Sequence, residues 1–292
     1  MFDDGKHRNR RRRVAEFMRM AQHGIATPPP VNGKVVVSRL PAGESMVLSE
    51  APAVKLVLDG EEIHEIDGRS YVLRPGRMLL VDRGAPYRVT IRRGGSAAGL
   101  CIYLPGEYAS APAPDEGFLA RALLQTAETN PLGQLLSHSA KLFHQDREPL
   151  DLDALLLRVR TALPSILAQA AGSMERLGAV KASTRRELLN RLESARAYLH
   201  ENKDRAVPLT ELASVAAMSS FQLTRYFSLA FGDPPSRYHR RVRLQEAAER
   251  LRRREASITE IAFAAGYGEL SAFTHAFARE FGCPPSAIAA AA

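Results

Sequence analysis

The chain is predicted to be a multidomain α+β protein, in which an antiparallel β domain with associated helices precedes an all-α domain. Its 292 residues are enough for two separate hydrophobic cores. The first half holds short alternating apolar runs typical of strands, whereas the second half holds longer apolar periods typical of helices. With 45% hydrophobic and 25% charged residues, the composition is that of a globular protein. No apolar run approaches the roughly 20 residues that span a bilayer, so no membrane association is expected.

The N-terminal arm, residues 1–33, carries a basic cluster at Arg8 and at Arg10 to Arg13. No apolar segment follows this cluster, so the sequence predicts no secretion signal and a cytoplasmic protein. A solvated tail is the commoner role for such an arm. The formal net charge of +8 favours a polyanionic partner, although excess basic residues also serve solubility.

Residues 34–110 are predicted to form the β domain. Seven short runs alternate with Gly, Pro and Asp: KVVVSRL, SMVLSEA, AVKLVLDG, SYVLRPG, RMLLVD, PYRVTIRR and GLCIYLP. Closely spaced runs of this kind, rich in β-branched residues, indicate an antiparallel sandwich or barrel.

Residues 111–172 are predicted to be helical, because the apolar period lengthens after the Pro-rich segment APAPDEG. The predicted helices are FLARALLQTA, LGQLLSHSAKLF and LDLDALLLRVRTALPSILAQAA, separated by X-Pro pairs at Pro131 and Pro149. Pro164 is expected to kink or restart the third helix. These helices have more leucine-rich faces than one sheet needs, which predicts a homodimer interface.

Residues 173–183 lose this periodicity and are predicted to be a linker, after which residues 184–292 form the all-α domain. The first helix of this domain is expected to bury a stripe made of Leu188, Leu192, Ala195 and Leu199.

Two segments of this domain repeat one pattern, LTELASVAAMSSFQLTRYFSLAFGDPP from Leu209 and ITEIAFAAGYGELSAFTHAFAREFGCPP from Ile258. Each predicts a short helix, a tight turn and a longer helix, which is the helix-turn-helix arrangement. The predicted turn and cap residues are Ser219, Gly232, Gly266 and Gly282. The predicted core positions are Leu209, Leu212, Ala213 and Ala216, Ile258, Ile261, Ala262 and Ala265, with Leu223, Phe227, Phe273 and Phe277.

The segment from Ser236 to Arg254 is predicted to be a linker helix that buries Leu244, Ala247, Ala248 and Leu251. At 1.5 Å per residue it would measure about 28 Å, comparable to one DNA turn of about 34 Å. Two units held at this separation could read successive major-groove segments from one side. Some arginines of this helix are expected to contact phosphate and others only water.

From Leu188 to its end, the chain resembles the AraC/XylS family of bacterial transcriptional regulators, on the two repeats quoted above. The resemblance implies a sequence-specific transcription regulator, with double-stranded DNA and RNA polymerase as partners; an activator is one interpretation, and activation against repression stays open. In this family the second helix of each unit reads DNA. Carried over by position, the DNA-contacting residues are Ser220, Phe221, Gln222, Thr224 and Arg225 in the first unit, and Glu269, Leu270, Ser271, Thr274 and His275 in the second.

The two sets differ in chemistry. Arg225 can make a bidentate contact to guanine and Gln222 one to adenine, each worth about 1 to 3 kcal/mol of discrimination. The family often has an arginine at the position of His275, and Leu270 offers only apolar contact. The second unit is therefore predicted to anchor on phosphate more than to discriminate bases. The alternative for every one of these residues is exposure to solvent without contact to DNA.

Residues 34–104 resemble the cupin-like sensor domain that members of this family place first, mainly in YVLRPGRMLLVDRGAPYRV. This implies a cupin-like antiparallel β-barrel and an effector-responsive regulator. Metal-binding cupins need paired histidines, but Lys55 and Tyr87 stand where such ligands are expected, so neither metal nor cofactor is predicted. The candidate effector-binding residues are Lys55, His64, Tyr71, Tyr87 and Tyr103. The alternative is that the tyrosines only pack and that His64 lies on a hairpin turn.

No catalytic residue is assigned, because the sequence offers no nucleophile beside a base, no metal-ligand cluster and no phosphate loop. Cys101 and Cys283 lie far apart, so neither a disulfide framework nor a thiolate metal site is predicted. The chain is therefore not predicted to be an enzyme. A β domain that binds a partner protein in place of a small-molecule effector stays open as the alternative.

Overall fold

The computed structural model describes residues 34–48, 51–82, 86–104, 122–144, 152–178 and 181–291. These divide into two compact units, with the boundary between Gly172 and Ser173. The N-terminal arm, with its basic cluster at Arg8 and Arg10 to Arg13, lies outside the described residues. Within the described helices, none is long and apolar enough to cross a membrane.

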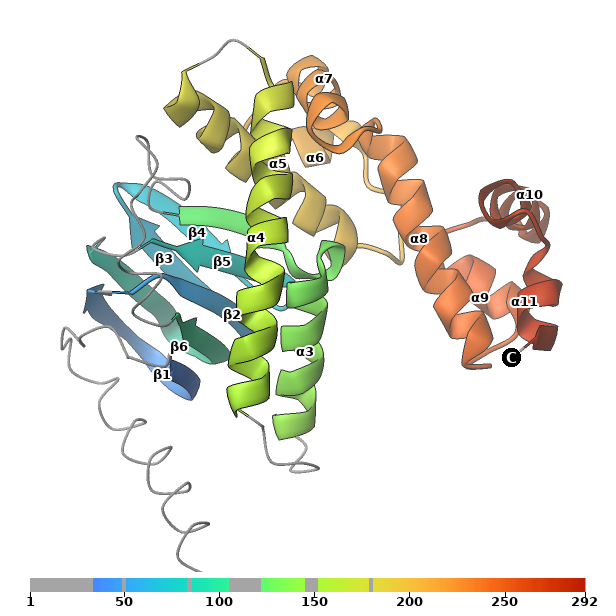
Figure 1. The fold of residues 1–292 in the computed structure, drawn as a ribbon. Coiled ribbons are helices and arrows are strands. Elements are labelled where there is room, and N and C mark those ends of the chain that lie inside the picture. Colours follow the sequence, from blue (N-terminus) through green and yellow to red (C-terminus); the bar gives the residue numbers. More distant parts are fainter. Residues whose placement is uncertain are drawn as a thin grey trace, which may run out of the picture. The chain divides into compact units, whose positions relative to one another are not determined.

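The first unit holds an antiparallel seven-stranded sheet that forms a near-closed barrel (Figure 1). Its strands are β1 (Lys34–Leu48), β2 (Ala53–Gly60), β3 (Glu62–Ile66), β4 (Arg69–Leu73), β5 (Arg77–Val81), β6 (Pro86–Tyr103) and β7 (Ala122–Thr126). The strand order is β4-β3-β6-β2-β5-β7, and β1 also pairs with β6. β1 and β6 each join two runs that the sequence predicts as separate strands, and a register shift between Pro41 and Gly43 accommodates their bend.

Alternation along the strands gives the sheet a buried inner face. Val57, Ile66, Tyr71, Leu73, Leu79, Val81, Tyr87, Val89, Ala122 and Leu124 make one core cluster. Residues paired across neighbouring strands point to the same face of the sheet. Polar residues that pair with members of this cluster therefore also point to the inner face. The antiparallel β domain predicted from the sequence is thus confirmed.

Two further strands, β3 and β7, differ from the prediction. β3 occupies a segment that the sequence analysis left between strands, so His64 lies in a strand and not on a hairpin turn. β7 forms where a helix is predicted from FLARALLQTA, because all five of its residues are buried against β5, with Ala122 opposite Val81. A short apolar run fits a buried strand and a buried helix equally well, and only the partner strand decides between them. Residues 118–121 of that run lie outside the described residues.

The helices that follow the barrel are η1 (Ala127–Thr129), α3 (Pro131–His144) and α4 (Leu152–Arg176). Asn130 caps α3, since its Oδ1 accepts a hydrogen bond of 2.7 Å from the backbone of Gly133. α4 continues without interruption through Pro164 and includes residues 173–176, which the sequence predicts as linker. Tertiary contact explains this extension, because Arg176 Nη2 donates to the carbonyl of Ala230 at 2.8 Å.

The second unit is all helical. After the last turn of α4 come α5 (Ala182–Glu201), α6 (Leu209–Val215), α7 (Ser220–Phe231), α8 (Pro235–Arg252), α9 (Ile258–Ala264), α10 (Leu270–Phe281) and α11 (Pro285–Ala291). The pairs α6–α7 and α9–α10 are the two predicted helix-turn-helix units, one toward each end of α8 (Figure 1). Phe227, Phe273 and Phe277 are fully buried, as predicted. Leu209, the first residue of α6, is an exception to the predicted core, because 40% of its surface is exposed.

The turns of the two units share a left-handed residue but differ in its identity. Gly266 has φ +74°, and a Cβ there would lie 3.0 Å from the Cα of Arg205. Ala217, at the matching position of the first unit, takes φ 50° with its methyl group. Gly232 and Gly282 end α7 and α10 in the same left-handed conformation, as predicted.

The shared glutamates of the repeat have separate structural roles. Glu211, in the first turn of α6, accepts hydrogen bonds from Arg205 and from the hydroxyl of Tyr198. Glu260 instead closes a capping box, where its side chain and that of Ser257 bond each other's backbone. The hydrogen bonds from Arg205 and then Tyr198 lower the pKa of Glu211 to about 2.

We expect Glu211→Gln to lower the Tm of the protein at pH 7, because Arg205 loses its carboxylate partner. A folded-state pKa of about 2 lies below the ordinary value of 4.5, so this stabilisation is complete above about pH 4.5 and is lost toward pH 2. Thermal denaturation at several pH values measures the effect. Glu249→Gln, at an exposed pair with Arg252, is the matched control and should leave the Tm unchanged. A Tm difference independent of pH between 2 and 7 would contradict the assignment.

Candidate nucleic-acid interface and effector site

The N-terminal half of α7 presents the five residues predicted for the first unit. Phe221 is the most exposed, with 76% of its surface accessible, and Gln222 and Arg225 are also exposed. Ser220 and Thr224 are half-buried, and Thr224 Oγ1 donates to the carbonyl of Ser220 at 2.9 Å. These side chains form one accessible surface at the start of a helix, where the peptide dipoles also favour an anion.

Arg225 and Gln222 differ in how free their side chains are. The guanidinium of Arg225 lies 5.6 Å from the ring centre of Tyr226, and no carboxylate within the described ranges pairs with it. Gln222 is engaged in a capping box with Ser219. Its Oε1 accepts from the Ser219 backbone at 3.2 Å, and its own backbone donates to Ser219 Oγ at 3.2 Å. Arg225 is therefore ready to contact a base, whereas Gln222 must leave its cap to do so.

α10 presents the five residues predicted for the second unit. Glu269, Ser271 and His275 are exposed, and Leu270 exposes 40% of its surface. Thr274 is half-buried and donates to the carbonyl of Leu270 at 2.9 Å, as Thr224 does in α7. Glu269 stands at the N-cap position but its side chain makes no cap hydrogen bond. The second surface is thus poorer in free cationic groups than the first.

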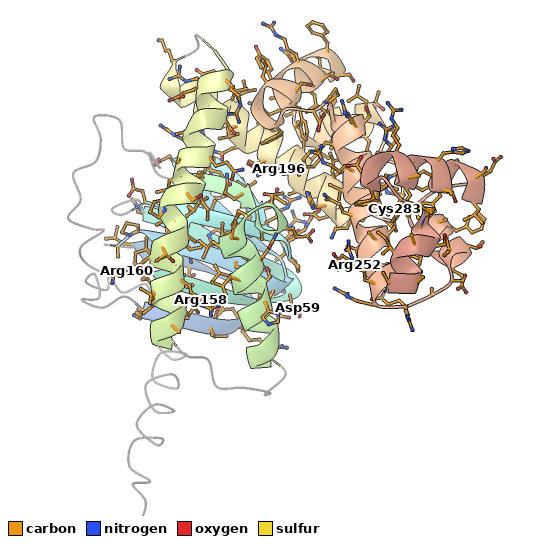
Figure 2. All side chains as sticks on the ribbon, turned by 45° about the vertical axis from the view of Figure 1, so that its right-hand side comes forward. Asp59, Arg158, Arg160, Arg196, Arg252 and Cys283 are labelled. Carbon is orange, nitrogen blue, oxygen red and sulfur yellow. The ribbon has the colours of Figure 1, made fainter. Side chains whose placement is uncertain are left out.

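α8 separates the two surfaces. Its 18 residues span about 27 Å at 1.5 Å per residue. Several of its arginines are held by acids: Arg241 and Arg237 by Asp233, and Arg252, labelled in Figure 2, by Glu249 at 2.6 Å. Arg240 is exposed, and the described part of the chain holds no carboxylate paired with it. Arg240 is accordingly the α8 arginine with the best access to a phosphate.

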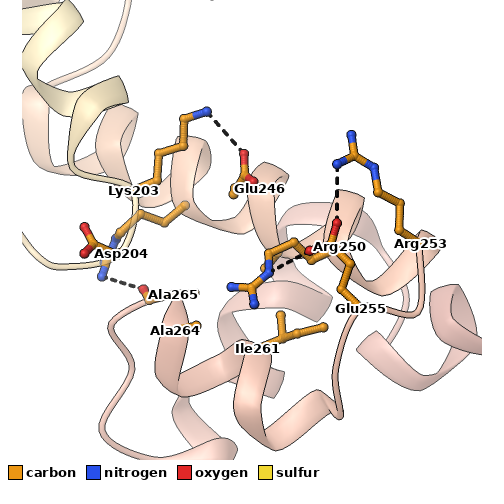
Figure 3. Close-up of a pocket in the computed structure, with 11 residues that line it drawn as sticks. Lys203, Asp204, Glu246, Arg250, Arg253, Glu255, Ile261, Ala264 and Ala265 are labelled. Carbon is orange, nitrogen blue, oxygen red and sulfur yellow. Dashed lines mark hydrogen bonds and ion pairs between the residues drawn. The ribbon is translucent and has the colours of Figure 1, made fainter. Parts of the chain in front are cut away.

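A pocket of about 370 Å³ lies where α8 and α9 face the segment after α5 (Figure 3). Its charged groups are mostly paired, with Lys203 3.2 Å from Glu246 and Arg250 3.3 Å from Glu255. Arg243 Nη1 donates to the carbonyl of Ala265 at 3.1 Å and so ties α8 to the second turn. None of the sequence-predicted site residues lines this pocket. We interpret it as a structural junction of the second unit.

The five predicted effector residues share the inner face of the barrel. Lys55 pairs in register with Cys101 and Leu79, His64 with Tyr71, and Tyr103 with Ala53. Lys55, His64 and Tyr87 lie together. Lys55 Nζ is 5.2 Å from the ring centre of Tyr87, and the rings of His64 and Tyr87 are 5.8 Å apart. Tyr103 lies under Lys34 Nζ, at 5.7 Å.

Burial shapes the ionisation of this inner face. It raises the pKa of Tyr87 to about 12 and lowers the pKa of His64, so both groups are neutral near pH 7. Burial opposes the charge of Lys55, but Cys101 and the surrounding acidic groups raise its pKa well above the ordinary value. The nearby Cys101 and then burial raise the pKa of Tyr103.

Glu62 is the site residue that sequence reasoning missed. It is 8% exposed, and its Oε2 lies 2.9 Å from Nε2 of His64. Burial opposes the ionisation of Glu62, but the hydrogen bond with His64 keeps its pKa below the ordinary value. The signal was available, because Glu62 and His64 are two residues apart in EEIHEI and so share one face of a strand. No set of three or more potential metal ligands gathers anywhere in the ranges that the structure covers.

Comparison with known proteins matches both units. An AraC-binding-like domain matches residues 31–168, and a helix-turn-helix domain matches residues 212–291. The thermoregulatory protein LcrF of Yersinia pestis is 28% identical over 238 residues, which cover 79% of this chain and 86% of LcrF. The transcriptional activator RhaS of Klebsiella pneumoniae is 35% identical over 98 residues, covering 34% of this chain and 35% of RhaS.

A solved structure, the DNA-binding domain of AdpA in complex with a target DNA, is 27% identical. It covers 34% of this chain and 90% of that domain, with a TM-score of 0.33.

We expect Gln222→Ala to lower the free energy of unfolding by about 0.5 to 1 kcal/mol, because it removes half of the capping box. Gln222→Glu should retain that stability, since Glu260 closes the same kind of box at α9. Chemical denaturation of both variants measures the difference. Unchanged stability in Gln222→Ala would show that the box contributes nothing.

Proposed function

The chain belongs to the AraC family of transcriptional regulators, and on that premise we propose how its DNA-binding unit divides the work of recognition. α7 discriminates bases and α10 mainly positions the protein on the phosphate backbone. The observation that carries this proposal is the contrast at one matched position. Arg225 offers an exposed guanidinium to the groove, where His275 offers an imidazole at the same place in α10.

The remaining residues of the two surfaces support the same division. Phe221 can contact a thymine methyl group and so adds to base reading by α7, whereas α10 offers only the apolar side chain of Leu270 and the acceptor of Glu269, which can meet the amino group of cytosine. Ser220, Ser271, Thr224 and Thr274 have hydroxyl groups suited to phosphate oxygens. Two surfaces separated by α8 fit successive major-groove segments, because the helix length is comparable to one DNA turn.

The β-barrel is proposed to sense a small-molecule effector through the residues grouped around Lys55, His64 and Tyr87. The support is a set of polar side chains on an otherwise apolar inner face. Tyr71 and Tyr103 flank this group on neighbouring strands. Calorimetric titration with small metabolites tests the proposal, and a protein that co-purifies in the absence of any metabolite heat would favour the partner-protein alternative.

Regulation is proposed to be activation in the cytoplasm, with RNA polymerase as the second partner. The name of the relative RhaS supports this, since RhaS is a transcriptional activator. Activation needs contact with polymerase, which an operator-bound protein can provide. Transcription in vitro from a target promoter tests it, and a fall in transcript on adding the protein would indicate repression.

We expect Arg225→Ala to weaken operator binding by about 1 to 3 kcal/mol and to relax the preference at one base position. His275→Ala should weaken binding less and equally across sequences, as loss of an anchoring contact does. Binding to a library of operator variants measures both effects. Arg279→Ala, in the last turn of α10, is the control for loss of one exposed arginine. Unchanged base preference in Arg225→Ala would exclude it as a reader.

We also expect the protein to be a homodimer at micromolar concentration, through the helical part of the first unit. Leu157 on α4 exposes 59% of its surface, which an interface would cover. Leu157→Asp should shift sedimentation from dimer to monomer, whereas Met46→Asp, at an exposed apolar residue of β1, should not. Sedimentation of the unchanged protein as a monomer would remove this proposal.

A further inference from the structure

Two polar side chains on the inner face of the barrel, Lys55 and His64, lie beside the ring of Tyr87. Lys55 Nζ lies 5.2 Å from the ring centre of Tyr87, and the ring of His64 lies 5.8 Å from it on the neighbouring part of the face. His64 is 0% exposed and Tyr87 is 1% exposed. Both groups are therefore removed from water. In the buried interior, a polar atom without a hydrogen-bond partner lowers the stability of the fold.

Two atoms of this group lack a hydrogen-bond partner. Nδ1 of His64 and the hydroxyl of Tyr87 are buried without any partner among the described residues. Buried polar atoms are normally satisfied, and two unsatisfied atoms on rings whose centres lie 5.8 Å apart indicate a ligand that completes both. The ammonium of Lys55 is a further group that a ligand could pair with, because no described carboxylate lies within ion-pair distance of it. Other cations of the barrel have such partners.

The hydrogen bond between His64 and Glu62 determines whether Nδ1 of His64 donates or accepts a hydrogen bond. Nε2 of His64 faces the Glu62 carboxylate at 2.9 Å, and a carboxylate only accepts hydrogen bonds, so Nε2 carries the proton. In the neutral ring, Nδ1 is then the acceptor. A ligand atom opposite Nδ1 must therefore be a donor, such as a hydroxyl group.

We propose that this cluster binds a small hydroxycarboxylate, whose carboxylate pairs with Lys55 and whose hydroxyl donates to Nδ1 of His64. The hydroxyl of Tyr87 donates a second hydrogen bond to the carboxylate. The inference rests on the proposed function, in which the barrel holds the effector, and it specifies the chemical class of that effector.

Carboxylate chemistry fits this cluster better than phosphate chemistry. A phosphate brings up to two charges and three strong acceptor oxygens, which call for several donors. Lys55 is one cationic donor and Tyr87 one neutral donor, while His64 offers an acceptor. The apolar neighbours of Tyr87 in the core, Val57 and Val89, suit a hydrocarbon portion attached to the acid.

The full chain is to be titrated with mandelate, lactate and malate, by calorimetry and by thermal denaturation. Each acid is compared with its carboxamide, which lacks the charge, and with the same acid lacking the hydroxyl. We expect at least one hydroxycarboxylate to raise the Tm by a few degrees at saturating concentration. Its carboxamide should not bind, and the acid without the hydroxyl should bind about tenfold more weakly, as expected for one lost hydrogen bond.

Variants then assign the contacts. Lys55→Met keeps the apolar stem and should lose acid binding by at least about tenfold, because a charge-assisted hydrogen bond is lost. Lys181→Met removes one positive charge from the second unit and is the control that should bind like the unchanged protein. His64→Phe keeps a ring but removes both nitrogens, so it should bind acids with and without the hydroxyl equally.

Three results would overturn the proposal: no acid of the three stabilises the unchanged protein, the carboxamide binds as well as the acid, or Lys55→Met binds like Lys181→Met. Binding of DNA by the unchanged protein is measured in parallel, as retention of the DNA by the protein. If DNA is retained but no acid binds, only this inference fails. If DNA is not retained, the proposed mode of DNA recognition fails as well.

Discussion

The buried stripe of α8 is the constraint on which the DNA-binding unit depends. One end of this helix belongs to the first core, where the ring of Tyr238 lies 5.4 Å from that of Phe227. The other end belongs to the second core, to which Leu244, Ala247, Ala248 and Leu251 contribute. Because one rigid helix enters both cores, neither helix-turn-helix unit can rotate about α8 without opening a core. The spacing of the two reading surfaces is therefore a property of packing and not of a linker's length.

Repetition in the sequence does not mean repetition of roles. Glu211 and Glu260 occupy equivalent positions, yet one forms an ion pair with Arg205 and the other closes a cap with Ser257. The start of α7 is capped by Ser219, whereas Glu269 leaves the start of α10 without a side-chain cap. The shared apolar residues keep the two units alike in shape, and the polar differences make them unlike in stability and recognition.

The sequence was most informative where structure is determined locally. Caps, glycine turns and helical stripes identify the second unit, because each depends on residues a few positions apart. The sheet was predicted less well, since β3 and β7 exist only through partners far along the chain. The same applies to the barrel site. Sequence patterns selected Lys55, His64 and Tyr87, whereas the spacing of Glu62 and His64 became informative only when residues 62–66 were seen to form a strand.

The two turns also differ in how freely they can change over evolutionary time. Position 217 already holds a residue with a Cβ in the left-handed region, so glycine there would relieve strain, and asparagine would be tolerated. Position 266 is restricted, because any side chain would meet the backbone of Arg205 as well as an unfavourable φ. The first turn can thus diverge by single substitutions, whereas the second is held to glycine. Descendants of this protein should vary their turn sequence mainly in the unit that carries Arg225.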